Sequence, residues 1–350
     1  MLLGGGLAPT AEGEHPIKTK HTLLVALFAF AAVAHAQPGF RPPPFAGGVP
    51  GLAQSQAIQV QRHQSRTLLY REALEELKKN PAAADYRPCP PGATENCVPK
   101  AAAPETPAGA KPEIRKRVAV LVGNNAYPDP IPPLLTPIAD IERVGEILRT
   151  RFDYDVTIVR NATKSAVARA LNRLAASVQP EDSVLVFYAG HGYLHDDTNM
   201  GYWLPVDASV KTAGNWISNA DISKFLSAIP ARQVILVSDS CFSGTLTREL
   251  RYSAGGKIDR VEILRKRSVL VLTSGGEEPV SDEGKDGHSI FAWHLIRVLR
   301  ETKGLAPGGE VFATVRKTVS REYPQTPQYG AAISAGHASG GEYLFEARVK

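Results

Sequence analysis

The stretch SVLVFYAGHG, residues 183–192, is the best starting point for predicting the fold. Its first seven residues form a continuous apolar run, which is typical of a strand buried on both faces of a parallel sheet. Gly190 should end the strand, and His191 and Gly192 follow at once. A histidine between two glycines is expected on an exposed turn. It is either a reactive group or an ordinary hydrogen-bonded loop histidine.

Similar apolar runs recur along the chain and alternate with amphipathic segments. Strands are predicted at 118–124, 154–159, 183–190, 233–239, 268–275 and, at the end of the chain, 341–347. Helices are predicted at 140–150, 164–178, 221–228, 289–300 and 311–321. This alternation predicts an α/β fold, with a mostly parallel sheet and helices on both faces.

A second reactive residue follows another of these strands. In LVSDSCFSG, residues 236–244, Cys241 comes just after the strand, fifty residues beyond His191. Function in such sheets collects at the carboxyl ends of the strands. If the two strands are neighbours, His191 and Cys241 emerge at the same edge. The alternative is that Cys241 packs in the core as a small apolar residue.

The pairing of a thiol with an imidazole has a chemical purpose. A free thiol has a pKa of about 8.5 and needs a base to become a nucleophile at neutral pH. The imidazole of His191 can take that proton and return it to an amine leaving group. The backbone amides of Gly192 and Cys241 are predicted to stabilise the oxyanion that forms during acyl transfer.

The sequence resembles the caspase-like cysteine peptidases, and in particular the bacterial metacaspase or orthocaspase type, over about residues 115–350. YAGHG and, fifty residues later, DSCFSG carry the resemblance, since this His-to-Cys spacing is known for caspases. The motifs NNAY, LPVDA, SNADI and QTPQYG support it. The resemblance implies a caspase-like (caspase-hemoglobinase) fold with a six-stranded sheet and a His191–Cys241 dyad.

The resemblance also implies what the S1 pocket binds. The residue two before the nucleophile is Asp239, which in metacaspases binds arginine or lysine, and Asp140 matches a second pocket acid. The loop 128–139 contains no arginine. Two carboxylates without a nearby cation attract a positive side chain, so cleavage after Arg or Lys is predicted. The alternatives are that Asp140 is a helix N-terminal acid and that Asp239 is a solvated or amide-bonded carboxylate.

Residues 245–267 are rich in arginine and lysine. They are either a site of self-processing or an ordinary solvated basic loop. Some metacaspases require calcium, and the resemblance implies that Asp207 and Asp221 correspond to part of the acidic cluster that binds it. The acids that the family has next to Asp221 and just after the nucleophile are missing here. No cofactor and no calcium dependence are therefore predicted, and no Cys/His set has the spacing of a zinc site.

The N-terminus resembles a secretory signal. Lys18 and Lys20 precede an apolar run at residues 23–33, and cleavage is expected after Ala36. An uncleaved anchor is the alternative, although the run is shorter than the roughly 20 residues that span a bilayer. The prediction is an exported protein, periplasmic or secreted, without a stable membrane span in its mature form.

Three segments are predicted: a signal peptide at 1–36, a Pro/Ala-rich arm or propeptide at 37–112, and a peptidase domain at 113–350. Cys89 and Cys97 lie in the arm and are expected to pair in an oxidising compartment, or to remain reduced. Cys241 is then the odd thiol of the three cysteines, as a reactive cysteine would be.

Other functions fit less well. The net charge of +5 comes without a basic stripe interleaved with aromatics, so nucleic acid is not the expected partner. The expected partners are protein or peptide substrates with basic residues. A phosphatase-type site fails because Thr247 stands where its arginine is needed. A nucleotide-binding turn fails because only one glycine follows the first strand. Two alternatives remain: a catalytically silent caspase-like binding module and a clostripain-like peptidase of the same fold.

Overall fold

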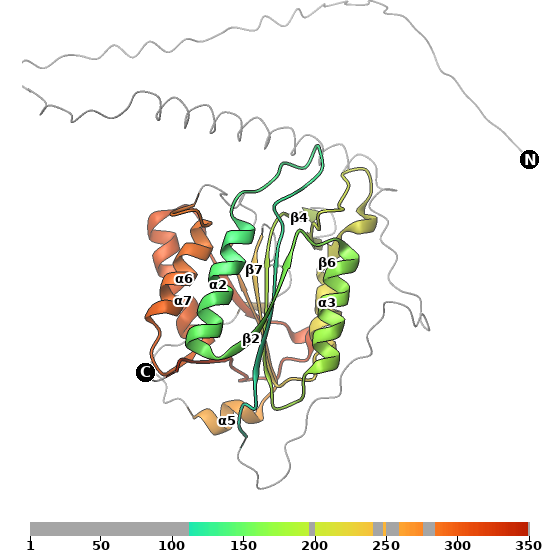
Figure 1. Cartoon of the computed structure of the whole chain (residues 1–350). Coiled ribbons are helices and arrows are strands. Elements are labelled where there is room, and N and C mark those ends of the chain that lie inside the picture. Colours follow the sequence, from blue (N-terminus) through green and yellow to red (C-terminus); the bar gives the residue numbers. More distant parts are fainter. Residues whose placement is uncertain (1–111, 196–199, 241–247, 250–258, 276–283, 349–350) are drawn as a thin grey trace, which may run out of the picture. The chain divides into compact units, whose positions relative to one another are not determined.

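The computed structural model describes residues 112–195, 200–240, 248–249, 259–275 and 284–348 (Figure 1). Cys241, the two other cysteines, the signal and arm segments and about half of the basic segment lie outside the described residues. The expectations for them stay predictions. The expected domain boundaries also stay predictions.

The described residues form a central sheet with the strand order β2-β1-β3-β7-β9-β11-β8. The strands are β1 (Arg117–Gly123), β2 (Tyr154–Arg160), β3 (Ser183–Ala189), β7 (Gln233–Asp239), β8 (Arg248–Glu249), β9 (Ser268–Thr273) and β11 (Gln328–Ala331). The five strands β2, β1, β3, β7 and β9 are parallel, and β11 runs antiparallel to β9. The predicted mostly parallel sheet of six strands is confirmed, and the two-residue β8 extends it by one short strand.

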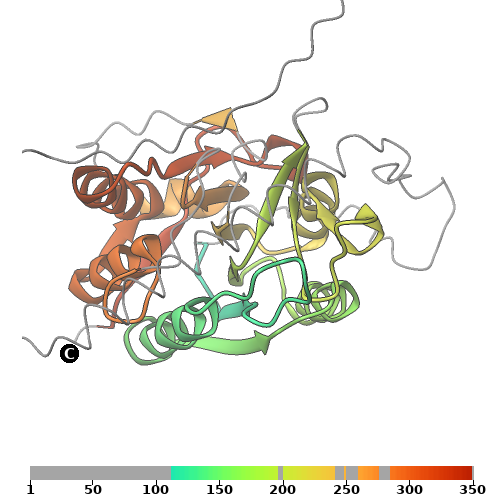
Figure 2. The ribbon, with the colours of Figure 1, turned by 90° about the horizontal axis from the view of Figure 1, so that it is seen from above.

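Helices cover both faces of the sheet, as predicted (Figures 1 and 2). One face carries α2 (Pro137–Phe152), α6 (Ile290–Glu301) and α7 (Gly308–Glu322), and the other carries α3 (Lys164–Ser177) and α4 (Asn219–Ala228). The short helix α5 (Arg260–Arg265) was not predicted, because six residues give too little periodicity to detect. Among the described residues, no helix combines the length and apolar character needed to cross a membrane.

Helices on both faces of the sheet explain why its strands are apolar along their whole length. Every residue of β3 and of β7 is buried. Side chains alternate along a strand, so Leu185 and Phe187 of β3 join the core under α2, α6 and α7. Val184 and Val186 join the core under α3 and α4. A strand buried in this way has no polar face, and its sequence therefore shows no alternation.

One predicted strand belongs elsewhere. The end of the chain forms β12 (Leu344–Glu346), which pairs with β10 (Leu305–Pro307) in a separate two-stranded sheet rather than in the central sheet. The sixth strand of the central sheet is instead β11, which begins inside the QTPQYG segment. It escaped prediction because it is four residues long and contains Gly330, which weakens the usual strand pattern.

A small sheet follows directly from β3. It consists of β4 (Gly192–His195), β5 (Met200–Trp203) and β6 (Ile217–Ser218), and two short 3-10 helices occur at Ala213–Asn215 and Ile333–Ala335. Tyr127 and Trp216 belong to an aromatic-rich core cluster that packs with this sheet. The small sheet lies at the carboxyl ends of the central strands, where β4 is labelled in Figure 1, and Tyr127 of the cluster contacts His191.

Candidate active site

The register of β3 and β7 places two of the predicted site residues at one edge of the sheet. Ala189, the last residue of β3, lies opposite Asp239, the last residue of β7. The amide of Gly190 donates to the carbonyl oxygen of Asp239 at 3.2 Å. His191 is the next residue. The neighbouring strands that the dyad requires are therefore present.

The backbone of His191 is held by a buried tyrosine. Its N–H donates to Tyr127 Oη at 3.0 Å, and that hydroxyl donates to the carbonyl oxygen of Leu204 at 2.9 Å. The two rings also meet edge to face, with centroids 4.7 Å apart. Burial raises the pKa of Tyr127 to about 12, so its hydroxyl keeps the proton that it donates.

A backbone carbonyl orients the imidazole. His191 Nε2 lies 2.8 Å from the carbonyl oxygen of Pro132. A carbonyl oxygen only accepts, so Nε2 must carry a proton. In the neutral ring Nδ1 is then the basic nitrogen. Pro132 was not predicted as a site residue, because a backbone carbonyl leaves no signature in a sequence.

Gly190 is required by the close approach of two tyrosines. A Cβ atom on Gly190 would lie 2.7 Å from Tyr127 Oη and 2.9 Å from Tyr188 Oη, both too close. The first glycine of the GHG motif therefore makes room for the hydroxyl that binds His191. The second, Gly192, is buried and begins β4, opposite Trp203 of β5.

The two predicted pocket acids converge on Ser289, the residue that precedes α6. Asp140 lies in the first turn of α2, and one of its carboxylate oxygens accepts from the Ser289 amide at 3.3 Å. Asp239 accepts from the Ser289 hydroxyl at 2.5 Å. Both carboxylates are buried, with exposed fractions of 1% and 4%. The reading of Asp239 as a solvated carboxylate is therefore wrong.

His288 is a further member of this site that the sequence analysis passed over. Its Nδ1 lies 2.7 Å from a carboxylate oxygen of Asp140. The preceding Asp286 and Gly287 both have positive φ angles, of 57° and 81°. Asp-Gly is a common pair in such tight turns, and this turn delivers His288 to Asp140. The Asp-Gly pair in the sequence predicts the turn. It does not predict that the turn brings His288 to Asp140, because those residues are 148 positions apart in the chain.

The electrostatics of Asp140 follow from its burial. Burial raises the pKa of its carboxyl above the usual value. The hydrogen bond and the charge of His288, and the Ser289 amide, act in the opposite direction. Asp140 also lies in the first turn of α2, where the helix dipole favours an acid. Its two interpretations, as a helix N-terminal acid and as a pocket acid, are therefore compatible.

The two acids discussed for calcium have structural partners. Asp207 accepts from the amide of Lys164 at 2.8 Å. Asp221 forms a capping box with Ser218 at the start of α4. Within the described parts of the chain, no group of three or more His, Cys, Asp or Glu side chains could hold a metal ion.

Two arginines of the basic segment have partners in the folded domain. Arg267 is buried, and its guanidinium donates to the carbonyl oxygens of Ala231 and Leu226 at 2.5 and 3.2 Å. Burial lowers the pKa of Arg267 to about 10. Arg260 lies 3.4 Å from the carboxylate of Glu346. Whether residues 245–267 are a site of self-processing or an ordinary basic loop stays a prediction, since about half of them lie outside the described residues.

The five-stranded parallel core, with a histidine after its central strand and buried carboxylates beside it, defines a caspase-like α/β fold. A family model described as the caspase domain matches residues 116–335, so the chain belongs to this family of cysteine peptidases.

Several metacaspases are similar in sequence. Metacaspase-1A of Neurospora crassa is 28% identical over 197 residues, which cover 51% of this chain and 43% of that protein. Metacaspase-1B of Aspergillus terreus is 26% identical, over 50% of this chain and 52% of its own. Metacaspase-7 of Arabidopsis thaliana is 28% identical, over 39% and 37%. The chain thus spans about half or less of the length of these relatives.

Solved structures give a looser likeness. Caspase-1 from Spodoptera frugiperda is 12% identical, and the match covers 67% of this chain and 94% of that one, with a TM-score of 0.48. A protein from Geobacter sulfurreducens is 21% identical over 62% of this chain and 93% of its own, with a TM-score of 0.45.

Proposed function

We propose that this chain is a cysteine endopeptidase in which His191 and Cys241 form the catalytic dyad and which cleaves after Arg or Lys. One observation carries the specificity: the buried carboxylates of Asp140 and Asp239, from α2 and β7, meet at Ser289 on the edge of the sheet that also bears His191. The family membership supports the peptidase chemistry.

The proposed reaction uses His191 twice. Nδ1 of His191 takes the thiol proton of Cys241, and the thiolate attacks the scissile carbonyl carbon. The amides of Gly192 and Cys241 stabilise the oxyanion of the tetrahedral intermediate. The imidazolium then protonates the departing amine, which leaves an acyl-enzyme. Water, deprotonated by His191, hydrolyses the thioester and restores the thiol. The Pro132 carbonyl supports these steps by keeping the proton on Nε2.

The acids would recognise a basic side chain by charge and by hydrogen bonding. Each ionised carboxylate has about four lone-pair sites, so Asp140 retains capacity after it accepts from His288 and Ser289. An arginine or lysine side chain would compete with the His288 imidazole for Asp140. A negative side chain would meet two buried carboxylates and be repelled.

We also propose that the protein is exported and that the signal segment is removed after Ala36. The proposed substrates are proteins with exposed basic residues. The chemistry above needs no cofactor, so we propose that calcium is not required, and the test below includes it as a separate condition.

The test uses the full chain and two fluorogenic peptides, one ending in Arg and one in Asp, each assayed with and without calcium. We expect cleavage after Arg, and we expect Cys241→Ala and His191→Ala to abolish it. Asp140→Asn should raise KM for the Arg peptide by about tenfold or more, because a charge-assisted contact is lost. Asp155→Asn, an exposed acid on β2, is the matched control and should have no effect.

The outcomes separate the alternatives. Cleavage after Asp would overturn the pocket assignment and leave the dyad intact. Cleavage that persists in Cys241→Ala would overturn the dyad. A folded chain that cuts neither peptide, with or without calcium, would support a silent binding module.

A further inference from the structure

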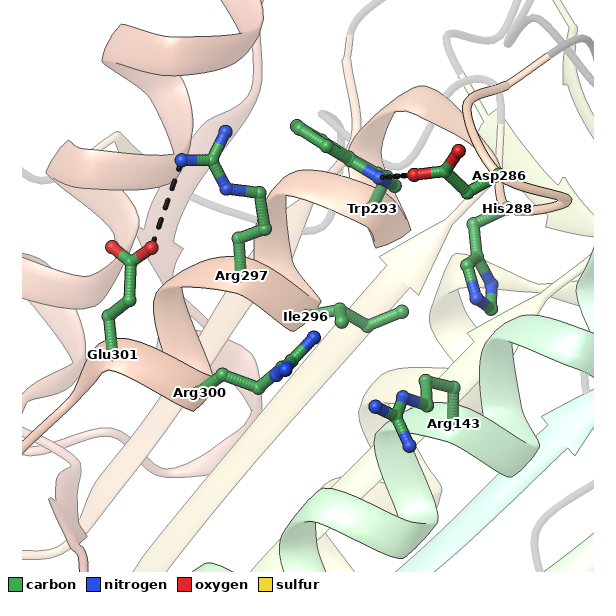
Figure 3. Close-up of a pocket in the computed structure, with 8 residues that line it drawn as sticks. All are labelled: Arg143, Asp286, His288, Trp293, Ile296, Arg297, Arg300 and Glu301. Atoms are coloured by element: carbon green, nitrogen blue, oxygen red, sulfur yellow. Dashed lines mark hydrogen bonds and ion pairs between the residues drawn. The ribbon is translucent and has the colours of Figure 1, made fainter.

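A cleft between α2 and α6 carries more positive charge than its surroundings neutralise. It has a volume of about 510 Å³, within the range of small-molecule sites. Arg143 lines it from α2, and Ile296, Arg297 and Arg300 line it from α6 (Figure 3). Figure 3 shows the guanidinium groups of Arg143 and Arg300 directed into the same opening from the two facing helices.

The three arginines differ in how far they are already engaged. Arg143 pairs with Glu146 one turn along α2, in an exposed ion pair of the kind that contributes little. Arg297 lies 3.7 Å from Glu301 and 4.7 Å from the centroid of the Trp293 ring. The side chain of Arg300 makes no hydrogen bond or ion pair with any described residue.

The acids in the cleft offset this charge only in part. Asp286 accepts from the indole N–H of Trp293 at 3.0 Å, and Glu301 is the partner of Arg297. Lys285 adds a further positive charge beside the cleft, 4.3 Å from the Trp293 ring centroid. Four positive charges, on Arg143, Arg297, Arg300 and Lys285, thus face three negative ones, on Glu146, Asp286 and Glu301, and Arg300 is the arginine of the cleft without an acidic partner among the described residues.

We propose that this cleft binds a compact dianion, a phosphate group or a small dicarboxylate, between Arg143 and Arg300. Planar guanidinium groups bind phosphate and carboxylate oxygens in pairs of parallel hydrogen bonds, and two of them on opposite walls suit a ligand with two negative charges. The cleft adjoins the acidic pair, since His288 lines it and also contacts Asp140, but the arginines lie at the other end of its lining, away from Asp140 and Asp239. It does not depend on the proposed peptidase activity.

Trp293 provides a local reporter. The chain has three tryptophans, and the other two are remote: the Trp203 indole donates to Ser238 Oγ and the Trp216 indole to the Ser209 carbonyl. Indole N–H signals of the full-length Cys241→Ala protein can be followed by NMR, with Trp293→Phe to assign the signal. Titration with inorganic phosphate, and separately with succinate, should shift the Trp293 signal saturably and leave the other two unchanged. Comparing the two affinities distinguishes phosphate from dicarboxylate.

Variants test the two walls of the cleft. Arg300→Ala and Arg143→Ala should each weaken the affinity by about tenfold or more, the loss expected for a charge-assisted hydrogen bond. Arg173→Ala, an exposed arginine on α3, should have no effect. The two distant indole signals show that each variant is folded. The proposal is overturned if neither anion gives a saturable shift, if sodium chloride at equal ionic strength gives the same shift, or if both cleft variants bind as tightly as the parent.

Discussion

Ser289 connects three parts of the site through one small side chain and its amide. Its hydroxyl donates to Asp239 and accepts from the amide of Ala292, so it also caps α6. Its own amide donates to Asp140. Loss of the hydroxyl should therefore affect both helix stability and the orientation of Asp239, and these two effects can be separated.

We predict that Ser289→Ala raises KM for an Arg peptide by about tenfold, because Asp239 loses a charge-assisted hydrogen bond. The change in kcat should be smaller, since Ser289 positions a binding group and does not touch the reacting atoms. Thr163→Ala removes the matching cap of α3, where Thr163 accepts from Ala166. Each variant should lose about 1 kcal/mol of unfolding free energy. Equal effects of the two variants on KM would refute a positioning role for Ser289.

At the level of elements, Tyr343 joins the terminal segment to the central sheet. The residue lies just before β12, outside that sheet, yet its side chain is fully buried. Its hydroxyl lies 2.6 Å from that of Tyr154 on β2 and accepts from Ser183 Oγ on β3 at 3.0 Å. The end of the chain is thereby tied to two strands with which its backbone does not pair.

Tyr343→Phe should lower the unfolding free energy by about 1–3 kcal/mol, because buried hydroxyls of Tyr154 and Ser183 lose their common partner. Urea unfolding of the full chain measures this change. Tyr323→Phe, at the end of α7, is the matched control, because Tyr323 makes no side-chain hydrogen bond with any described residue. A similar loss in both variants would mean that the shared hydroxyl network contributes nothing specific.

For the molecule as a whole, we predict that two histidines make the unfolding free energy depend on pH. The pKa values of His294 and His337 are lowered, in both cases mainly by burial. For His294 the charge of Glu322 acts in the opposite direction. The unfolded chain takes up these protons near the ordinary histidine pKa of about 6.5, and the folded chain takes them up only at lower pH. Unfolding free energy should therefore fall as pH decreases through about 6.5.

His294→Leu should reduce this dependence, since it removes one of the two groups. Urea unfolding at pH 7.5 and 5.5 should give a smaller difference for the variant than for the parent chain. Asp140 and Glu342 have raised pKa values and act with the opposite sign at lower pH, so the comparison is best made above pH 5. An unchanged difference would show that His294 does not contribute.

The sequence by itself determined the class of fold and predicted the chemistry of the site. Buried parallel strands have no polar face, so β1, β3, β7 and β9 were evident as apolar runs. Residues directly after such strands share an edge, so His191 and Asp239 could be brought together in advance. These inferences use only local patterns and one rule about parallel sheets.

Only the tertiary structure decided which groups hold the site residues. The Pro132 carbonyl on His191, the Tyr127 hydroxyl on its backbone and the His288 imidazole on Asp140 come from loops, where no periodicity constrains the chain. The place of β12 likewise depends on a distant partner, because it pairs with β10 and not with a strand of the central sheet. Contacts between residues far apart in sequence depend on how loops close over the sheet edge, which a local pattern does not encode.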